Sequence, residues 1–334
     1  MNNSSVSVTA ETETGNIAVI NYTIYALILL LPNTLAFISL WKAKSVPKKI
    51  KLPILNLIVS DLLTGLSFVS YLIILLLDLP KSTESILCYV QMIWTLTAAF
   101  ASFSIVGGLA IDRCICIYYE YIYLTKITVK IILVWQVLTW IVSFFFATLI
   151  FIDTNWEAVC LYRYVVGKYG RIIHIYYSIF LRIISGVAFI AICIKMKRMI
   201  NADKLKGVKR RGIFRTTSKV LVIGLTFHGM YFPLFCHHVF VLIFPDNFDD
   251  AHVFYVFASL LTVVNSFVNP FIYVWRFPEC RLQLKIMICS WNKNIVNEEN
   301  RKLKRILVSF LDPPESSTIR QTSLTDTDIN ASFS

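Results

Sequence analysis

Charged residues are scarce in this chain. Only 16% of its residues are Asp, Glu, Lys or Arg, while 57% are hydrophobic, and the mean hydropathy is +0.66. A soluble globular protein typically has about 25% charged residues, so this composition excludes an ordinary soluble domain. The hydrophobic residues also come in long blocks, and the two features together predict an integral membrane protein.

Several patterns that carry chemistry are also absent from the sequence. The eight cysteines form no CxxC pair and no Cys/His cluster at metal-ligand spacing, which argues against a zinc site. There is no serine–histidine–acid arrangement and no phosphate-binding loop, so we expect no enzyme. The first fifteen residues are polar and lack the basic and apolar regions of a cleaved signal peptide.

Long apolar stretches dominate what is present. A membrane-spanning helix needs about 20 mostly apolar residues, and seven stretches meet this requirement with no long soluble domain between them. They are Ile17–Trp41, Ile54–Leu77, Cys88–Ile111, Ile131–Phe151, Ile172–Ile194, Val220–Phe244 and Val253–Trp275. The sequence therefore predicts an all-α membrane protein, with a seven-helix bundle in residues 17–275.

The net charge of +12 is concentrated in particular loops. Five lysines lie between the first two spans, and the connection from Lys195 to Lys219 carries ten basic residues and one acid. The opposite loops are neutral or acidic. Because basic loops stay in the cytoplasm, we expect residues 1–16 to be an extracellular tail and residues 276–334 to be cytoplasmic. Topology thus accounts for the basic excess, and no nucleic-acid partner is expected.

This topology has consequences for two kinds of covalent modification. Only Cys88 and Cys160 are predicted to lie outside the cell, where oxidising conditions favour disulfides. We expect a bond between them that ties the start of the third span to the loop after the fourth. Asn2 and Asn3 both lie in N-x-S sequences, which are glycosylation acceptors on an extracellular tail.

Polar side chains inside the spans need partners, because an unpaired polar group in hydrocarbon is costly. Asp61 lies at the middle of the second span, and intramembrane carboxylates are often functional. Two interpretations remain open: a structural, hydrogen-bonded or protonated aspartate, or an ion or proton site shared with the polar stretch Asn265–Tyr273. Arg182 lies well inside the fifth span, and the sequence indicates no partner for it.

The chain after the seventh span alternates basic and apolar residues at helical spacing. Over residues 276–290 this pattern is typical of a short amphipathic helix on the membrane surface. Cys289 near its end is either palmitoylated or an unmodified thiol. We expect residues 291–334 to be a disordered cytoplasmic tail with phosphorylation sites. The candidate sites are Ser316, Ser317, Thr318, Thr322, Ser323, Thr325 and Thr327.

A set of motifs occurs in one order along the chain. It comprises Asn33 in the first span, the N-L-x-x-x-D pattern ending at Asp61, Cys88 placed 24 residues before Asp112-Arg113, Trp140, and the N-P-x-x-Y sequence Asn269–Tyr273. In this set the chain resembles class A (rhodopsin-like) G-protein-coupled receptors over residues 17–289. Within that family the end of the chain is similar to adenosine receptors, and the missing fifth-helix proline is similar to the melanocortin and cannabinoid receptors.

The resemblance implies two functional centres in the bundle. A sodium ion would act as an allosteric ligand that favours the inactive state, held by Asp61, Ser102, Asn265 and Asn269. An activation switch would comprise Asp112, Arg113, Phe227, Tyr231, Pro233, Asn269, Pro270 and Tyr273. Tyr231 replaces the family's tryptophan, Cys114 replaces its tyrosine, and the usual acid at the start of the sixth helix is absent. These departures imply elevated basal activity or an unusual lock of the inactive state.

The resemblance also places a ligand pocket, which would be mostly apolar. Its lining would be Thr95, Ala99, Tyr162, Leu234, Phe235, His238, Ser259 and Val263. Amine receptors have an aspartate at the position of Thr95, and the seventh span has no lysine to hold retinal, so neither ligand is expected. His238 and Val263 replace the residues that recognise adenosine, so adenosine is not expected either.

The predicted function is therefore a plasma-membrane receptor for an unidentified extracellular ligand, with a heterotrimeric G protein as its partner. The resemblance also implies arrestin and receptor kinases as partners of the C-terminal serines and threonines, and membrane lipid around the bundle. Two alternatives remain open. One is a non-signalling receptor-like binding protein, which Cys114 and Tyr231 allow. The other is a transporter or channel that uses Asp61 and Arg182 as a charge pathway, although no inverted repeat is visible.

Overall fold

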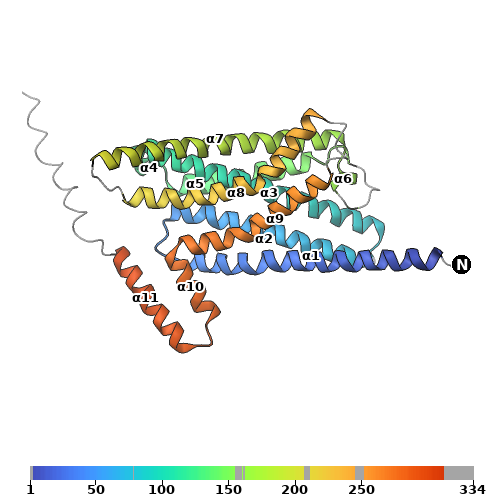
Figure 1. Cartoon of the computed structure of the whole chain (residues 1–334), viewed down its shortest axis with the longest axis horizontal. Helices are drawn as coiled ribbons and strands as arrows, with labels where there is room; N and C mark the ends of the chain where they lie inside the picture. The colour runs from blue at the N-terminus through green and yellow to red at the C-terminus, as the bar shows by residue number, and fades with distance from the viewer. Residues whose placement is uncertain are drawn as a thin grey trace, which may run out of the picture.

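The computed structural model describes residues 3–77, 79–154, 160, 162–206, 211–244 and 252–311. Within these ranges the chain forms helices and turns and no strand. Seven helices are long and apolar enough to cross a membrane, and they lie side by side along the long axis of the molecule (Figure 1). They are α1 (Asn3–Lys42), α2 (Lys48–Leu76), α3 (Lys81–Tyr118), α5 (Val129–Leu149), α7 (Lys168–Lys206), α8 (Arg211–Ile243) and α9 (His252–Arg276).

The seven helices confirm the predicted spans, but several are longer. α3 begins seven residues before Cys88 and ends seven residues after Ile111. Polar residues at such ends lie beyond the apolar stretch and still complete helical turns, because most of them have adequate helix propensity. α1 begins at Asn3, so residues 3–16, expected to be a separate tail, continue the first helix. Asn2 lies outside the described residues.

α3 is the central helix of the bundle. It contacts α2, α5, α7 and α8, while α1 packs against α2 and α9. The disulfide between Cys88 and Cys160, which the topology predicted, ties the start of α3 to the segment before α6 (Tyr162–Val165). Trp140 of α5 donates a hydrogen bond from Nε1 to Asn56 Oδ1 of α2, at 3.1 Å. The hydrogen bond thus links α5 to α2, and the disulfide fixes the segment before α6 to α3.

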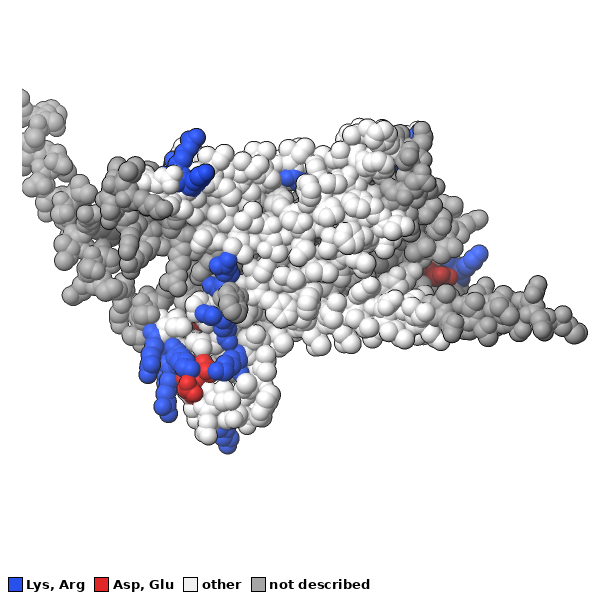
Figure 2. Space-filling model, in the orientation of Figure 1, with Lys and Arg blue, Asp and Glu red and all other residues white. Residues whose placement is uncertain are grey.

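The two ends of the bundle differ in charge. Lysine and arginine gather mainly at the end that carries the α1–α2 connection and α10 (Pro278–Ile288), and the visible middle of the bundle is nearly free of charge (Figure 2). We call this the lysine-rich end, and the end that carries Cys88–Cys160 the disulfide end. A band of uncharged surface between two charged ends fits a bilayer core.

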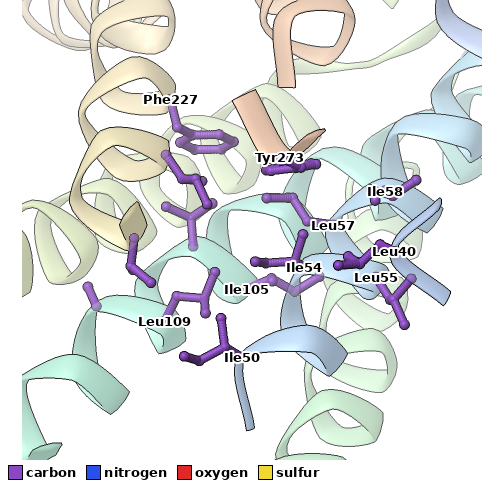
Figure 3. Close-up of a cluster of buried hydrophobic side chains, with 14 of the residues drawn as sticks. Leu40, Ile50, Ile54, Leu55, Leu57, Ile58, Ile105, Leu109, Phe227 and Tyr273 are labelled. Carbon is purple, nitrogen blue, oxygen red and sulfur yellow. The ribbon is translucent and has the colours of Figure 1, made fainter. Parts of the chain in front are cut away.

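An apolar cluster fills the lysine-rich half of the bundle. Its buried side chains include Leu40, Ile50, Ile54, Leu57, Ile105, Leu109, Phe227 and Tyr273. In Figure 3 the side chains of Ile54, Leu57 and Ile105 lie between Tyr273 and Ile50. Because lipid is as apolar as these side chains, close packing rather than removal from water holds such helices together.

The predicted amphipathic helix after the seventh span is α10. Its Glu279 carboxylate is buried and accepts hydrogen bonds from the backbone N–H groups of Lys44 (2.8 Å) and Ser45 (2.6 Å), so α10 is fixed to the α1–α2 connection. Cys289 directly follows this helix.

The prediction of disorder from residue 291 onward is wrong for its first part. Lys293–Leu311 form an amphipathic helix, α11, which packs against α10. The Glu299 carboxylate forms an ion pair with Lys285 Nζ of α10 at 2.6 Å. This contact between the two helices is not apparent from the sequence of α11 alone. The serines and threonines predicted as phosphorylation sites lie outside the described residues.

Candidate ligand cavity and switch

Asp61 forms a polar centre with α9 in the middle of the bundle. Its side chain is 2% exposed, and Asn269 donates from Nδ2 to Asp61 Oδ2 at 3.1 Å. The Ser266 hydroxyl, one turn earlier on α9, is a second hydrogen-bond partner of the carboxylate. Ser102 of α3 shares a 2.7 Å hydrogen bond with Ser60, the residue before Asp61. The polar centre therefore contains side chains of α2, α3 and α9, and the carboxylate itself is bonded to α9.

Several oxygens around this centre have no partner. Asn265 Oδ1, Asn269 Oδ1 and the Tyr273 hydroxyl are buried without a hydrogen bond. Asn265 and Asn269 are four residues apart, so they lie on the same face of α9. One carboxylate and several unused neutral oxygens are the donor set that a hard cation prefers. Of the four residues predicted to hold sodium, Asp61, Asn265 and Asn269 supply such donors, whereas the Ser102 hydroxyl is bonded to Ser60 and Ala98.

The side chain of Arg113, near the lysine-rich end of α3, is fixed by contacts with Asp112 and Tyr123. It is 3% exposed and forms an ion pair with the neighbouring Asp112. Its Nη2 also donates to the hydroxyl of Tyr123, at 2.6 Å. Tyr123 belongs to α4 (Glu120–Thr125), and Lys49 Nζ lies 4.5 Å from its ring centroid. Burial raises the pKa of Tyr123, so its hydroxyl stays neutral.

Three aromatic rings connect the middle of α3 to α8. The Phe103 ring centroid lies 4.9 Å from that of Phe227 and 4.5 Å from that of Tyr231. Phe227 and Tyr231 also contact each other, with centroids 4.5 Å apart. Pro233 lies two residues beyond Tyr231 inside α8, where proline removes a backbone hydrogen bond and favours a kink. The Phe103 ring of α3 is therefore in direct contact with two rings of α8.

A cavity of about 250 Å³ opens above this cluster, on the side toward the disulfide end. Five of the eight predicted pocket residues line it: Thr95, Ala99, Leu234, Ser259 and Val263. The other three do not. Tyr162 instead bonds the ring nitrogen of His174, His238 bonds Arg182, and Phe235 packs against Phe232. Ser102 and Ser266 form the floor, so the cavity reaches the polar centre.

A family model described as 7 transmembrane receptor (rhodopsin family) matches residues 32–273. The chain belongs to this family. It is a multi-pass membrane receptor of the G-protein-coupled type, and this membership indicates a receptor rather than an enzyme.

Several residues of this receptor's sites are not apparent from its sequence. Tyr123 lies between the third and fourth predicted spans, where the sequence predicted no helix, and the structure places it in α4 against Arg113. His174 and Tyr255 line the cavity from α7 and α9. Arg182 also lines it, and His238 is the partner that the sequence did not indicate. A charged residue in an apolar span was the only signal available for this site.

Proposed function

We propose that this receptor binds a small extracellular ligand in the cavity and activates heterotrimeric G proteins from its lysine-rich end, at the plasma membrane. The observation that carries the proposal is that the cavity and the Arg113 contact lie on one helix, the cavity at the middle of α3 and Arg113 near its end. Thr95 and Arg113 are 18 residues apart on α3, which corresponds to about 27 Å at about 1.5 Å per residue. One helix therefore connects the two faces of the membrane.

The orientation follows from charge and chemistry. The lysine-rich end faces the cytoplasm, because basic loops are retained there. The disulfide end then faces the oxidising exterior, where the bond between Cys88 and Cys160 is stable. Glycosylation at Asn2 and Asn3 fits this orientation. The cavity opens toward the side from which a ligand would arrive.

The aromatic contacts suggest how the ligand acts. A ligand in the cavity displaces or pulls on Phe103 and Tyr231, and α8 moves outward about Pro233. Arg113 is then released from Asp112 and Tyr123, and a crevice for the G protein opens. Asn269, Pro270 and Tyr273 adjust in α9, where Tyr273 lies at the edge of the apolar cluster. The ligand shifts this balance only by binding the open state more tightly than the closed one.

A sodium ion fits the polar centre as an allosteric ligand. Asp61 would supply the negative charge, and Ser102, Asn265 and Asn269 would supply neutral oxygens. The ion would link α2, α3 and α9 and so favour the closed arrangement. Arrestin, receptor kinases acting on the C-terminal serines and threonines, and palmitoylation of Cys289 next to α10 belong to the same proposal.

Second-messenger output in cells tests this function. Wild type and Arg113→Ala are expressed at matched surface levels and read with reporters for each G-protein class. We expect wild type to exceed mock-transfected cells in at least one reporter and Arg113→Ala to lose that excess. If wild type equals mock cells in every reporter, with ligand candidates present, and Arg113→Ala changes nothing, the protein is a non-signalling binding protein of the same fold.

A further inference from the structure

Arg182 is the charged residue of the ligand cavity. It projects from α7, lines the cavity together with Ser178 and Tyr231, and is 7% exposed. Its Nη1 lies 2.7 Å from His238 Nδ1 of α8. Its Cζ lies 4.7 Å from the ring centroid of Phe103. The guanidinium is therefore held by two helices at a defined position.

These two contacts orient the guanidinium without neutralising it. Arginine has donors only, so His238 must accept through Nδ1 and is unprotonated there. A neutral imidazole and an aromatic ring supply no negative charge. The Nε–H of Arg182 is buried and has no hydrogen-bond partner. One edge of the guanidinium is thus unused.

The described part of the chain offers no counter-ion for this charge. In the ion pairs found there, Asp112 is paired with Arg113, and Glu298 and Glu299 are paired with lysines of α10 and α11. Asp61 is bonded to Asn269 and Ser266 instead. A buried charge without a partner is strongly destabilising. Among the described residues, Arg182 is therefore a buried cation without a counter-ion, and a bound anion would supply one.

Given the receptor function proposed above, we propose that its ligand carries a carboxylate that pairs with the unused edge of Arg182. Two parallel N–H groups of a guanidinium edge match a carboxylate in geometry and charge. Among the described residues that line the cavity, Arg182 alone carries a full charge. A single cation balances a monoanion, whereas a phosphate dianion would need a second one. A carboxylate paired with Arg182 would also lie near Phe103, whose ring contacts Phe227 and Tyr231 of α8.

The cavity limits the size of this acid. A volume of about 250 Å³ equals the space of about eight water molecules at about 30 Å³ each. A small organic acid fits this volume. The hydroxyls of Thr95, Ser178 and Ser259 line the remaining wall and suit a second polar group on the ligand. Thr64, Thr262, Ser102 and Ser266 are further polar lining residues, and the other lining residues apart from Arg182 are apolar or aromatic.

Thermal melting of the purified receptor tests the proposal. The probes are acetate, lactate, hexanoate, octanoate and benzoate, each compared with its primary amide, which has the same shape and no charge. We expect at least one acid to raise the melting temperature of wild type in a concentration-dependent way, and its amide to have no effect. Arg182→Gln abolishes the shift, whereas Lys168→Gln, which removes an exposed charge from the same helix, preserves it.

The melting temperature of a variant measured without any acid tests whether the unpaired charge of Arg182 destabilises the receptor. Arg182→Met keeps the length of the side chain and removes its charge, so we expect the empty variant to melt above empty wild type. Lower melting of Arg182→Met would show that Arg182 is a structural residue and would overturn the proposal. No shift with any of the acids, or equal shifts with acids and amides, would overturn it as well.

The two proposals fail separately in these experiments. Melting reports binding alone, so a wild type that an acid stabilises but that activates no G protein contradicts only the proposed function. A wild type that activates a G protein but is stabilised by none of the acids contradicts only the carboxylate inference.

Discussion

The guanidinium of Arg182 lies over the ring of Phe103, with 4.7 Å between Cζ and the ring centroid. The same Phe103 ring also contacts the rings of Phe227 and Tyr231 of α8. One side chain of α3 therefore contacts both the charged group of the cavity and the helix proposed to move. A change at Arg182 can therefore reach α8 in two ways, directly through His238 and through the Phe103 ring.

Phe103→Leu tests this connection. The substitution keeps an apolar side chain but removes two aromatic contacts, each worth about 0.5–1.5 kcal/mol beyond area burial. We expect a lower melting temperature and basal second-messenger output that differs from wild type. Phe145→Leu is the matched control, because Phe145 is 56% exposed on the outer face of α5. If both variants behave alike, Phe103 does not couple the cavity to α8.

Tyr123→Phe weakens the closed state. The variant loses the 2.6 Å hydrogen bond to Arg113, and such a bond contributes about 0.5–1.5 kcal/mol net. Since about 1.4 kcal/mol is a factor of ten in an equilibrium, we expect basal output to rise by about twofold to tenfold. Tyr121→Phe serves as the control, because Tyr121 is 78% exposed in the same short helix. Unchanged output of Tyr123→Phe would exclude Tyr123 from the lock.

Asp61→Asn tests the sodium site. The purified wild type is melted in sodium chloride and in N-methyl-D-glucamine chloride at the same ionic strength. An ion at ten times its dissociation constant stabilises by about 1.4 kcal/mol, so we expect wild type to melt higher in sodium. Asp61→Asn should melt at the same temperature in both salts. Equal melting of wild type in the two salts would show that the polar centre holds no sodium.

The α10–α11 hairpin should depend on pH. The hydrogen bond from Lys285 holds the pKa of Glu299 below its ordinary value of 4.5. A lowered pKa stabilises the folded hairpin above the ordinary value, and this contribution is lost as the pH falls through the lowered pKa. The protection factor of the α11 amides, which corrects the exchange rate for its intrinsic pH dependence, should therefore be high above pH 4.5 and fall below it. In Glu299→Gln the protection factor should be low throughout this window, and a protection factor as high as that of wild type would contradict the role of the pair.

The sequence predicted much of the bundle, because long apolar stretches have few alternatives in a bilayer. It also indicated Asp61 and Asn269, since polar residues in such stretches are conspicuous. It missed Tyr123 and the Arg182–His238 pair, because contacts between residues 10 and 56 positions apart depend on how helices pack. Helix α11 was missed because its amphipathic pattern stabilises a helix only where another surface, here α10, covers one face.

Nucleotide exchange on purified heterotrimeric G proteins tests the central claim most directly. Wild type and Arg113→Ala are placed in lipid nanodiscs and compared with empty nanodiscs for each G-protein class. We predict that wild type accelerates exchange on at least one class and that Arg113→Ala, with unchanged melting, reduces this by about tenfold or more, which corresponds to about 1.4 kcal/mol of lost interaction. Exchange no faster than with empty nanodiscs in every class, or full activity of Arg113→Ala, would contradict the account.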